Sequence, residues 1–109
     1  MLLKRYWRRA KKKGIEFNLT TAWLRDKMKF GKCEVTKIPF SFYPKNSALN
    51  PYLPSIDRID PTKGYTKDNC QVTIIGFNNL KSNYTEQEIS DFCEGFVKYY
   101  EENNEDLLG

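Results

Sequence analysis

The sequence predicts a small α+β domain, in which two short strands lie between a helix near each end of the chain. Apolar residues recur at helical spacing in residues 2–13 and 85–103, and two β-type runs flank a turn-rich loop between them. No internal repeat or linker interrupts these segments. The chain has 109 residues, enough for one small domain and too few for two. We therefore expect a single domain over residues 1–109.

The first segment is expected to be a basic helix over residues 2–13 that ends at Gly14. Its apolar residues are expected to form a packed stripe, with the aromatic ones as core contacts rather than base-stacking platforms: Leu3, Tyr6, Trp7 and Ala10. Its basic residues are expected to fan over the remaining surface: Lys4, Arg5, Arg8, Arg9, Lys11, Lys12 and Lys13. Such a surface can neutralise the phosphates of a nucleic acid. The alternative interpretation is a solvated basic face without a partner.

A second helix is expected soon after the first. Ile15–Leu19 is predicted to be a short extended stretch, and Thr20 is a predicted N-cap of a helix that runs to about Met28. The helix is expected to stop before Gly31. Residues 1–30 would then form a basic helical leader.

The next segment is poorer in pattern. Residues 33–42 (CEVTKIPFSF) have the composition of short strands and are expected to bend at Pro39. Residues 43–53 are rich in Asn and Pro and are predicted to form a loop.

Two strands and a short helix are predicted to follow in order. Pro54–Ile59 is a predicted strand, and residues 60–64 (DPTKG) form a strong turn signal because Pro is favoured inside type I and II turns. Cys70–Ile75 is the second predicted strand. Gly76 is expected to break it, after which residues 77–82 can form a short helix.

The last segment is predicted to be an amphipathic helix over residues 85–103. Thr85 and Glu88 form a T-x-x-E capping box at its start. A continuous apolar stripe follows and is expected to pack on the body of the domain: Ile89, Phe92, Cys93, Phe96, Val97 and Tyr100. Residues 101–109 are expected to fray.

The charge is strongly uneven along the chain. Residues 1–85 hold seventeen basic and six acidic residues, a net +11, whereas residues 86–109 hold one lysine and eight acids, a net −7. A basic body with an acidic end suits a polyanion partner such as nucleic acid. Charge alone is weak evidence, however, because solvated basic faces are common.

Composition also limits the compartment and the metal chemistry. No apolar run approaches the roughly 20 residues of a membrane helix, and the basic N-terminus lacks the apolar stretch of a secretory signal. We therefore expect a cytosolic protein with no membrane partner. The three cysteines are far apart and there is no histidine, so four N/S zinc ligands cannot be assembled within the chain. We expect buried reduced thiols and no structural zinc site.

The stretch SIDRIDPTKGYTKDNCQVTIIGFNNLK, from Ser55 to Lys81, resembles the HNH motif of the ββα-metal nucleases. That motif has the form D-H-x-x-P, a loop with a central Asn, a strand, and then N-x-x-K or H-x-x-K. The upstream GIEFNLT and CEVTKIPFSF also resemble the leader of small phage-type HNH proteins, so the resemblance spans roughly residues 8–92. It implies a ββα-metal motif over residues 54–82 and a metal-dependent endonuclease or nickase that acts on double-stranded DNA. It also implies a phage-encoded protein in the cytoplasm of a bacterial host, and a homodimer is possible because small nucleases often need one to cut both strands.

The resemblance implies a role for four residues of this chain. Asp57 and Asn78 take the places of the two metal ligands, and an oxygen pair of this kind suits Mg²⁺ or Mn²⁺. Asn69 takes the place of the central Asn, which braces the loop through backbone hydrogen bonds. Lys81 would approach the phosphate beside the metal. Asn79 is the alternative ligand in a shifted register.

More ordinary interpretations exist for the two implied metal ligands. An Asp next to an Arg on a strand is usually part of a salt bridge, as Asp57 would be with Arg58. An Asn at a strand-to-helix junction is usually a cap, as Asn78 would be. Their joint occurrence with Asn69 and Lys81 in the family's order favours the metal site.

The chain departs from the family's pattern at one catalytic position, because Arg58 stands where the family has its histidine base. Arginine stays protonated and cannot act as a base, but it can bind phosphate and offset charge in the transition state. Besides a water activated by the metal, the candidate bases are Asp60, Tyr65, Lys63 and Lys67. Asp60 is more simply a turn cap, and Tyr65 a packing residue. The expected catalytic set is therefore Asp57, Arg58, Asn69 and Asn78.

Two functions remain open. The first is the nuclease itself, and the second is a catalytically silent DNA-binding protein with this fold. In both, DNA contacts are expected from two groups of basic residues, in the first helix and in the motif: Arg5, Arg8, Arg9, Lys11, Lys12, Arg58, Lys63 and Lys81.

Overall fold

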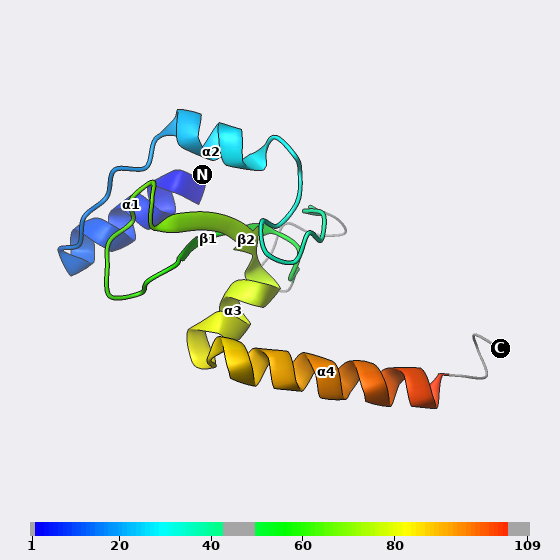
Figure 1. The fold of residues 1–109 in the computed structure, drawn as a ribbon. Helices are drawn as coiled ribbons and strands as arrows, with labels where there is room; N and C mark the ends of the chain where they lie inside the picture. Colours follow the sequence, from blue (N-terminus) through cyan, green and yellow to red (C-terminus); the bar gives the residue numbers. More distant parts are fainter. Residues whose placement is uncertain (1, 43–49, 105–109) are drawn as a thin grey trace. The chain divides into compact units, whose positions relative to one another are not determined.

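The computed structural model describes residues 2–42 and 50–104 (Figure 1), which form an α+β fold of four helices and one two-stranded antiparallel sheet. The chain divides into two compact units, Met1–Asn78 and Asn79–Gly109, and the division falls inside the third helix. Within these described ranges, no helix is long and apolar enough to cross a membrane.

Helix α1 (Leu2–Lys13) ends at Gly14 as predicted, and this glycine has the left-handed φ of 68° common after a helix. Leu3, Tyr6 and Ala10 are buried, so most of the predicted stripe is confirmed. Trp7 is 44% exposed, and its prediction as a core contact was wrong. The face of α1 that packs on the core is formed by Leu3, Tyr6 and Ala10. Trp7 lies at the margin of this face, so its indole stays partly exposed.

Helix α2 (Thr21–Met28) begins at the predicted cap, because Thr20 Oγ1 accepts a hydrogen bond of 3.1 Å from the backbone N–H of Trp23. It stops before Gly31, as expected. In the extended stretch that precedes it, Phe17 forms a single parallel bridge with Tyr65. This bridge ties the leader of the chain to the loop between the two strands.

The strands predicted in residues 33–42 are wrong. Among these residues the structure has one isolated bridge, between Lys32 and Pro39, and a tight turn at residues 34–36. Cys33 causes the difference: its sulfur accepts a hydrogen bond of 3.4 Å from Thr36 N, and its own N–H donates to Ile38 O at 2.9 Å. Despite their β-type composition, these residues form a turn and not a strand. Of the loop predicted at residues 43–53, residues 43–49 lie outside the described part.

The sheet consists of β1 (Pro54–Arg58) and β2 (Cys70–Ile74), each one residue shorter than predicted. The register pairs Ser55 with Thr73 and Asp57 with Gln71. The turn signal at residues 60–64 is confirmed by a backbone hydrogen bond of 3.1 Å from Lys63 N to Asp60 O.

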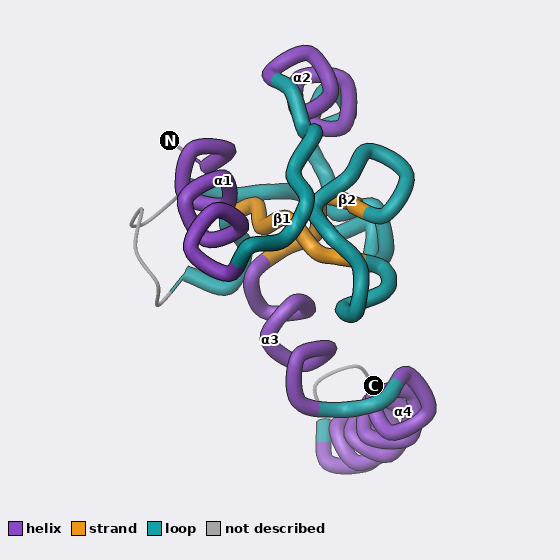
Figure 2. The backbone as a smooth tube through the Cα atoms, turned by 90° about the vertical axis from the view of Figure 1, so that its left-hand side faces the viewer, coloured by secondary structure: helices purple, strands orange, loops and turns teal. Residues whose placement is uncertain are grey.

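Helix α1 packs beside this hairpin, as both views show (Figures 1 and 2). The core of the first unit is a cluster from the helix, the extended stretch, the hairpin and the loop: Leu3, Tyr6, Ala10, Leu19, Ile56, Tyr65 and Cys70. The helix thereby closes one side of the two strands, which could not fold alone as an isolated hairpin.

Helix α3 (Ile75–Asn83) follows β2 without a loop (Figure 1). Gly76 was expected to separate the strand from the helix. It lies instead in the first turn of the helix. A Cβ at Gly76 would be 3.1 Å from Pro51 Cβ, and Gly76 N donates to Pro51 O at 3.0 Å. The glycine therefore permits a close approach of two backbone segments, which holds the start of α3 in place.

In the second unit, α4 (Glu86–Asn103) begins with the predicted capping box between Thr85 and Glu88. It stays helical to Asn103, so the fraying expected from residue 101 is not seen there, and residues 105–109 lie outside the described part. Of its apolar stripe only Ile89 is buried, while Phe92 and Phe96 are 52% and 63% exposed. The helix that carries the stripe, and the capping box at its start, are confirmed.

Candidate functional site

One face of the hairpin is polar. Alternate residues of a strand point to the same face, so Ser55 and Asp57 share a face of β1. The register places Thr73 and Gln71 of β2 directly opposite them. Ser55, Asp57 and Thr73 are all buried. Buried polar side chains on adjacent strands are unusual in a small domain and mark this face as the candidate site.

Asp57 is the charged centre of this polar face. Its carboxylate is only 5% exposed, and Gln71 Nε2 donates a hydrogen bond of 2.9 Å to its Oδ2. A buried carboxylate is costly unless hydrogen bonds or a cation compensate for the lost water. Gln71 supplies part of that compensation and fixes the orientation of the carboxylate from the neighbouring strand.

Asn78 reaches the same strand from α3. Its Nδ2 donates to Ser55 Oγ at 2.6 Å and to Ile56 O at 3.3 Å. Because Ser55 precedes Asp57 by two residues, Asn78 contacts β1 about 6.6 Å along the strand from Asp57. The structure therefore brings Asn78 against β1, the strand that carries Asp57, with the Asn78 amide nitrogen turned toward that strand. Asn78 lies inside α3, three residues after Ile75, and not at the cap position before the helix.

Tyr6 completes this arrangement, although no local feature of the sequence indicates it. The hydroxyl of Tyr6 lies 2.9 Å from Ser55 Oγ and accepts a hydrogen bond of 3.3 Å from Ile56 N. Ser55 thus joins α1 to Asn78 of α3. Analysis of the sequence did not identify Tyr6, Ser55 or Gln71 as parts of the site. The alternation of side chains along a strand would have placed Ser55 and Gln71 on the face of Asp57.

The donor set on this face fits a hard divalent ion. Asp57 has a carboxylate and Asn78 has an amide oxygen, both of which are ligand types that hard divalent ions take. Thr73 Oγ1 is buried on the same face and has no hydrogen-bond partner among the described residues, so a hydrophilic group there would be stabilised. The described residues contain no group of three or more His, Cys, Asp or Glu able to hold a metal. Waters and substrate oxygens would have to complete the coordination of an ion at the Asp57–Asn78 pair.

The loop between the strands is braced by Asn69. Its Oδ1 accepts from Asp60 N at 3.0 Å, and its Nδ2 donates to Asp60 O at 3.1 Å and to Gly64 O at 2.8 Å. Its own carbonyl accepts from Ile59 N at 2.7 Å. With a buried side chain and three backbone partners, Asn69 holds residues 59–64 in one conformation.

Arg58 follows Asp57 directly and its side chain is held on the loop side of the hairpin. Its Nη1 donates to Lys63 O at 2.9 Å, and its guanidinium carbon lies 4.9 Å from the centre of the Tyr65 ring. Because alternate strand residues point to opposite faces, Arg58 projects away from the face of Asp57.

The candidate bases are placed as their simpler roles predict. Asp60 Oδ1 accepts from both the hydroxyl of Thr62 at 2.6 Å and its N–H at 2.9 Å, and these bonds hold the pKa of Asp60 below its ordinary value. Tyr65 is buried, with its ring edge-on to Tyr6 at 5.5 Å. Lys63 and Lys67 are exposed on the loop.

The basic residues implied as DNA contacts fall into three places. Five of them are exposed on α1: Arg5, Arg8, Arg9, Lys11 and Lys12. Arg9 lies over the Tyr6 ring at 4.7 Å and Lys11 over the Trp7 ring at 5.0 Å, so two of these cations rest on aromatic faces of their own helix. Lys63 lies on the loop, and Lys81 lies in the last turn of α3, within the second unit.

The cysteines are free, and two of the three are buried as expected. Burial, with the charge of Asp57, raises the pKa of Cys70 to about 11, so this thiol stays protonated. Burial also acts to raise the pKa of Cys33, but hydrogen bonds from Thr36 and nearby backbone groups outweigh it and lower the value. Cys93 is exposed on α4, and its prediction as a buried thiol was wrong.

Neither a protein-family model, nor a curated protein, nor a solved structure matches this chain. Its function must therefore be argued from the polar face of the hairpin and from the charge around it.

Proposed function

We propose that the chain is a metal-dependent DNA endonuclease or nickase of the HNH type, which hydrolyses phosphodiester bonds. The observation that carries the proposal is that Asn78 of α3 donates hydrogen bonds to Ser55 and Ile56 of β1, the strand that carries the buried Asp57, whose carboxylate is oriented by Gln71. The order of strand, braced loop, strand and helix supports it, because this is the order that the ββα-metal motif requires.

Asp57 and Asn78 would hold Mg²⁺ or Mn²⁺. When bound, such an ion would offset negative charge on the phosphate and stabilise the leaving 3′ oxygen. Gln71 keeps the carboxylate of Asp57 in place from β2, and Ser55 keeps Asn78 in place from β1. Asn69 keeps the intervening loop rigid, so the site is organised before substrate arrives.

Double-stranded DNA is the proposed substrate because of the charge on α1. The helix carries seven basic residues and no acid, and its basic side chains are exposed. A row of cations on one rigid helix can neutralise several phosphates of a duplex at once. Lys63 and Arg58 would extend this surface toward the loop, where Arg58 already lies beside the Lys63 carbonyl.

A second candidate function is a catalytically silent DNA-binding protein. The observation that favours it is the engagement of Arg58 with Lys63 O and the Tyr65 ring, at the position where the family has its base. The chain has no histidine, so no side chain with an ordinary pKa near neutrality is available to activate water. In this case the polar face would keep its architecture while DNA affinity alone was retained.

Plasmid cleavage tests both candidates. Supercoiled plasmid is incubated with the full chain between pH 6 and 9, with Mg²⁺ or Mn²⁺, and with a chelator as control. Nicked or linear product that requires the metal supports the nuclease. Retarded but intact plasmid with both ions supports the silent binder. Cleavage that persists in the chelator contradicts both.

A further inference from the structure

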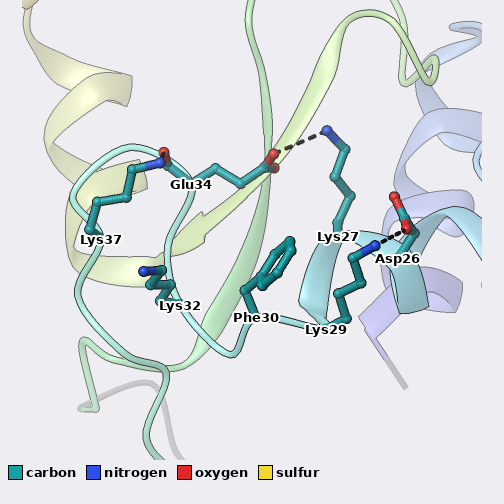
Figure 3. Close-up of a pocket in the computed structure, with 7 residues that line it drawn as sticks. All are labelled: Asp26, Lys27, Lys29, Phe30, Lys32, Glu34 and Lys37. Carbon is teal, nitrogen blue, oxygen red and sulfur yellow. Dashed lines mark hydrogen bonds and ion pairs between the residues drawn. The ribbon is translucent and has the colours of Figure 1, made fainter.

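A second polar hollow lies beside the end of α2, on a different part of the first unit from Asp57 (Figure 3). It has a volume of about 380 Å³, within the roughly 300–1,000 Å³ of ligand pockets. Four lysines and one aromatic ring line it: Lys27, Lys29, Lys32, Lys37 and Phe30.

Phe30 is held in place although its ring is 74% exposed. It stands between Lys29, the C-cap of α2, and Gly31, whose φ of 69° is left-handed. Gly31 N donates to Met28 O at 2.9 Å, and Gly31 O accepts from Phe40 N at 2.9 Å. The turn therefore fixes the backbone on both sides of the ring and presents the ring to solvent, where it contributes little to folding.

The ring stands among the lysines. In Figure 3 it lies between Lys27 and Lys29 on one side and Lys32 and Lys37 on the other. Lys29 Nζ is 5.2 Å from the ring centre, a cation–π distance. Because Phe30 is 74% exposed, a flat ligand can reach its ring.

The hollow keeps a net positive charge. Lys27 pairs with Glu34 at 3.0 Å and Lys29 with Asp26 at 3.2 Å, which leaves two of the four lysine charges without a carboxylate in the lining. Lys37 Nζ donates to the backbone carbonyl of Glu34 at 2.7 Å, a neutral acceptor, so its charge is not cancelled. Lys32 and Lys37 are both exposed. The excess charge thus lines the same hollow as the exposed ring of Phe30.

The wall that carries these lysines is rigid. Glu34 N donates to Val72 O at 3.0 Å, and Val72 N donates to Glu34 Oε2 at 2.6 Å, so the wall is tied to β2. Lys37 has a φ of 64°, which is uncommon for a residue other than glycine and costs free energy. Its N–H bond of 3.0 Å to Cys33 O holds it there. A lysine in a strained backbone conformation, on a segment that is hydrogen-bonded to β2, is a feature expected at a ligand site.

We propose that this hollow binds an unpaired nucleotide of a DNA strand. The base stacks on the exposed ring of Phe30, and the ammonium groups of Lys32 and Lys37 bind the phosphates on either side of it. Aromatic stacking with a flanking cationic groove is the general chemistry of single-strand binding, and it tolerates any base sequence. The inference rests on the proposed function in one respect, because it takes DNA as the polyanion, but it needs neither the metal nor cleavage.

The test is fluorescence anisotropy of a labelled oligothymidylate with the full chain, in chelator so that no cleavage occurs. We expect Phe30→Ala to weaken binding of the oligothymidylate by about tenfold, since stacking contributes roughly 1–3 kcal/mol per base. The matched control is Phe42→Ala, which removes another exposed phenylalanine (53% exposed) outside the hollow and should leave affinity unchanged. Circular dichroism of each variant confirms that it is folded.

Charge is tested separately. The double variant Lys32→Gln and Lys37→Gln should lower the slope of log affinity against log salt by about 1.4, at roughly 0.7 per phosphate contact on a single strand. Equal losses for Phe30→Ala and Phe42→Ala, or an unchanged salt slope in the lysine variant, would overturn the proposal. So would displacement of the oligothymidylate by free thymidine monophosphate at equal nucleotide concentration, because the hollow would then be a mononucleotide site.

The result does not depend on the outcome of plasmid cleavage. A chain that never cuts DNA but loses oligothymidylate affinity in Phe30→Ala keeps this site and loses the nuclease proposal. A chain that cuts plasmid while Phe30→Ala binds oligothymidylate normally keeps the nuclease and loses this site.

Discussion

Gln71 Nε2 lies 2.9 Å from Asp57 Oδ2 and donates a hydrogen bond to it across the two strands of the hairpin. The register that pairs these two residues is therefore also what aims the carboxylate. A shift of one residue would move both side chains to the other face, because side-chain direction alternates along a strand. The position of the candidate site thus depends on the same register that holds the core residue Ile56 in place.

The first prediction follows from the burial of Asp57. Asp57→Ala should abolish metal-dependent plasmid cleavage, by at least about a hundredfold, because one of the two protein ligands is lost. DNA affinity measured by gel retardation should fall little, since α1 supplies most of the cationic surface. Asp91→Ala, which removes an exposed carboxylate of α4, is the control and should cleave as the wild type does. Equal activity in Asp57→Ala and wild type would rule out Asp57 as a ligand.

The second prediction concerns the brace at Asn69. Asn69→Ala removes three hydrogen bonds to the backbone and leaves partly buried polar groups of Asp60 and Gly64 short of partners. We expect a loss of about 1–3 kcal/mol in the free energy of unfolding, measured by urea denaturation. Asn103→Ala is the matched control, because its single bond to Tyr99 O is exposed and should contribute under about 0.5 kcal/mol. A loss no larger than that of Asn103→Ala would mean that the loop does not need the brace.

Local chemistry made part of the fold predictable. The caps at Thr20 and Thr85 were found because a helix start depends on a few consecutive residues. The strands at Pro54 and Cys70 were found because strong turn signals separate them. The loop role of Asp60 was found for the same reason, since an Asp-Pro turn is decided within four residues.

Contacts distant in sequence could not be predicted in this way. The bond between Tyr6 and Ser55 joins residues 49 apart, and nothing local to either residue indicates it. Residues 33–42 have β-type composition, but the turn held by Cys33 and Thr36 overrides it. The hollow at Phe30 also escaped prediction, because its lysines come from α2 and from the following turn and meet only in the folded chain.

The third prediction is a pH dependence of stability. The hydroxyl and the N–H of Thr62 hold the pKa of Asp60 below its ordinary value, so this carboxylate stabilises the fold above the unfolded pKa, near 3.9. That contribution is lost as pH falls through the lowered folded-state pKa. The urea midpoint of the wild type should therefore fall between pH 5 and 2. Asp60→Asn keeps the turn acceptor but cannot titrate, so its midpoint should fall less over this range. An equal fall would show that Asp60 is not a source of the effect.

The fourth prediction concerns the charge of α1. Replacing Arg8, Arg9, Lys11 and Lys12 with Gln removes four exposed cations from one helix surface. The slope of log duplex affinity against log salt should flatten by about 3 to 4, at roughly 0.9 per phosphate contact on B-DNA. Lys98→Gln in the acidic α4 serves as control and should leave the slope unchanged. A slope that is the same in the α1 variant and the wild type would place α1 away from the DNA.

The last prediction separates the nuclease from the silent binder at Arg58. Arginine cannot accept a proton at any relevant pH, and here its guanidinium is held by Lys63 O and the Tyr65 ring. If the chain is a nuclease, Arg58→Ala should lower cleavage by removing positive charge near the phosphate. Arg58→His should raise cleavage, with a rate that increases with pH around 6.5, because it supplies a side chain able to act as a base. Arg58→Lys keeps the charge but not the paired geometry, and its cleavage rate should fall between those of wild type and Arg58→Ala.

If the chain is a silent binder, no variant cuts and all three changes alter affinity alone. Because Arg58 projects away from the face of Asp57, a histidine that remains beside Tyr65 would leave cleavage as low as in Arg58→Ala. That result would show that residue 58 is not the position of the base in this chain.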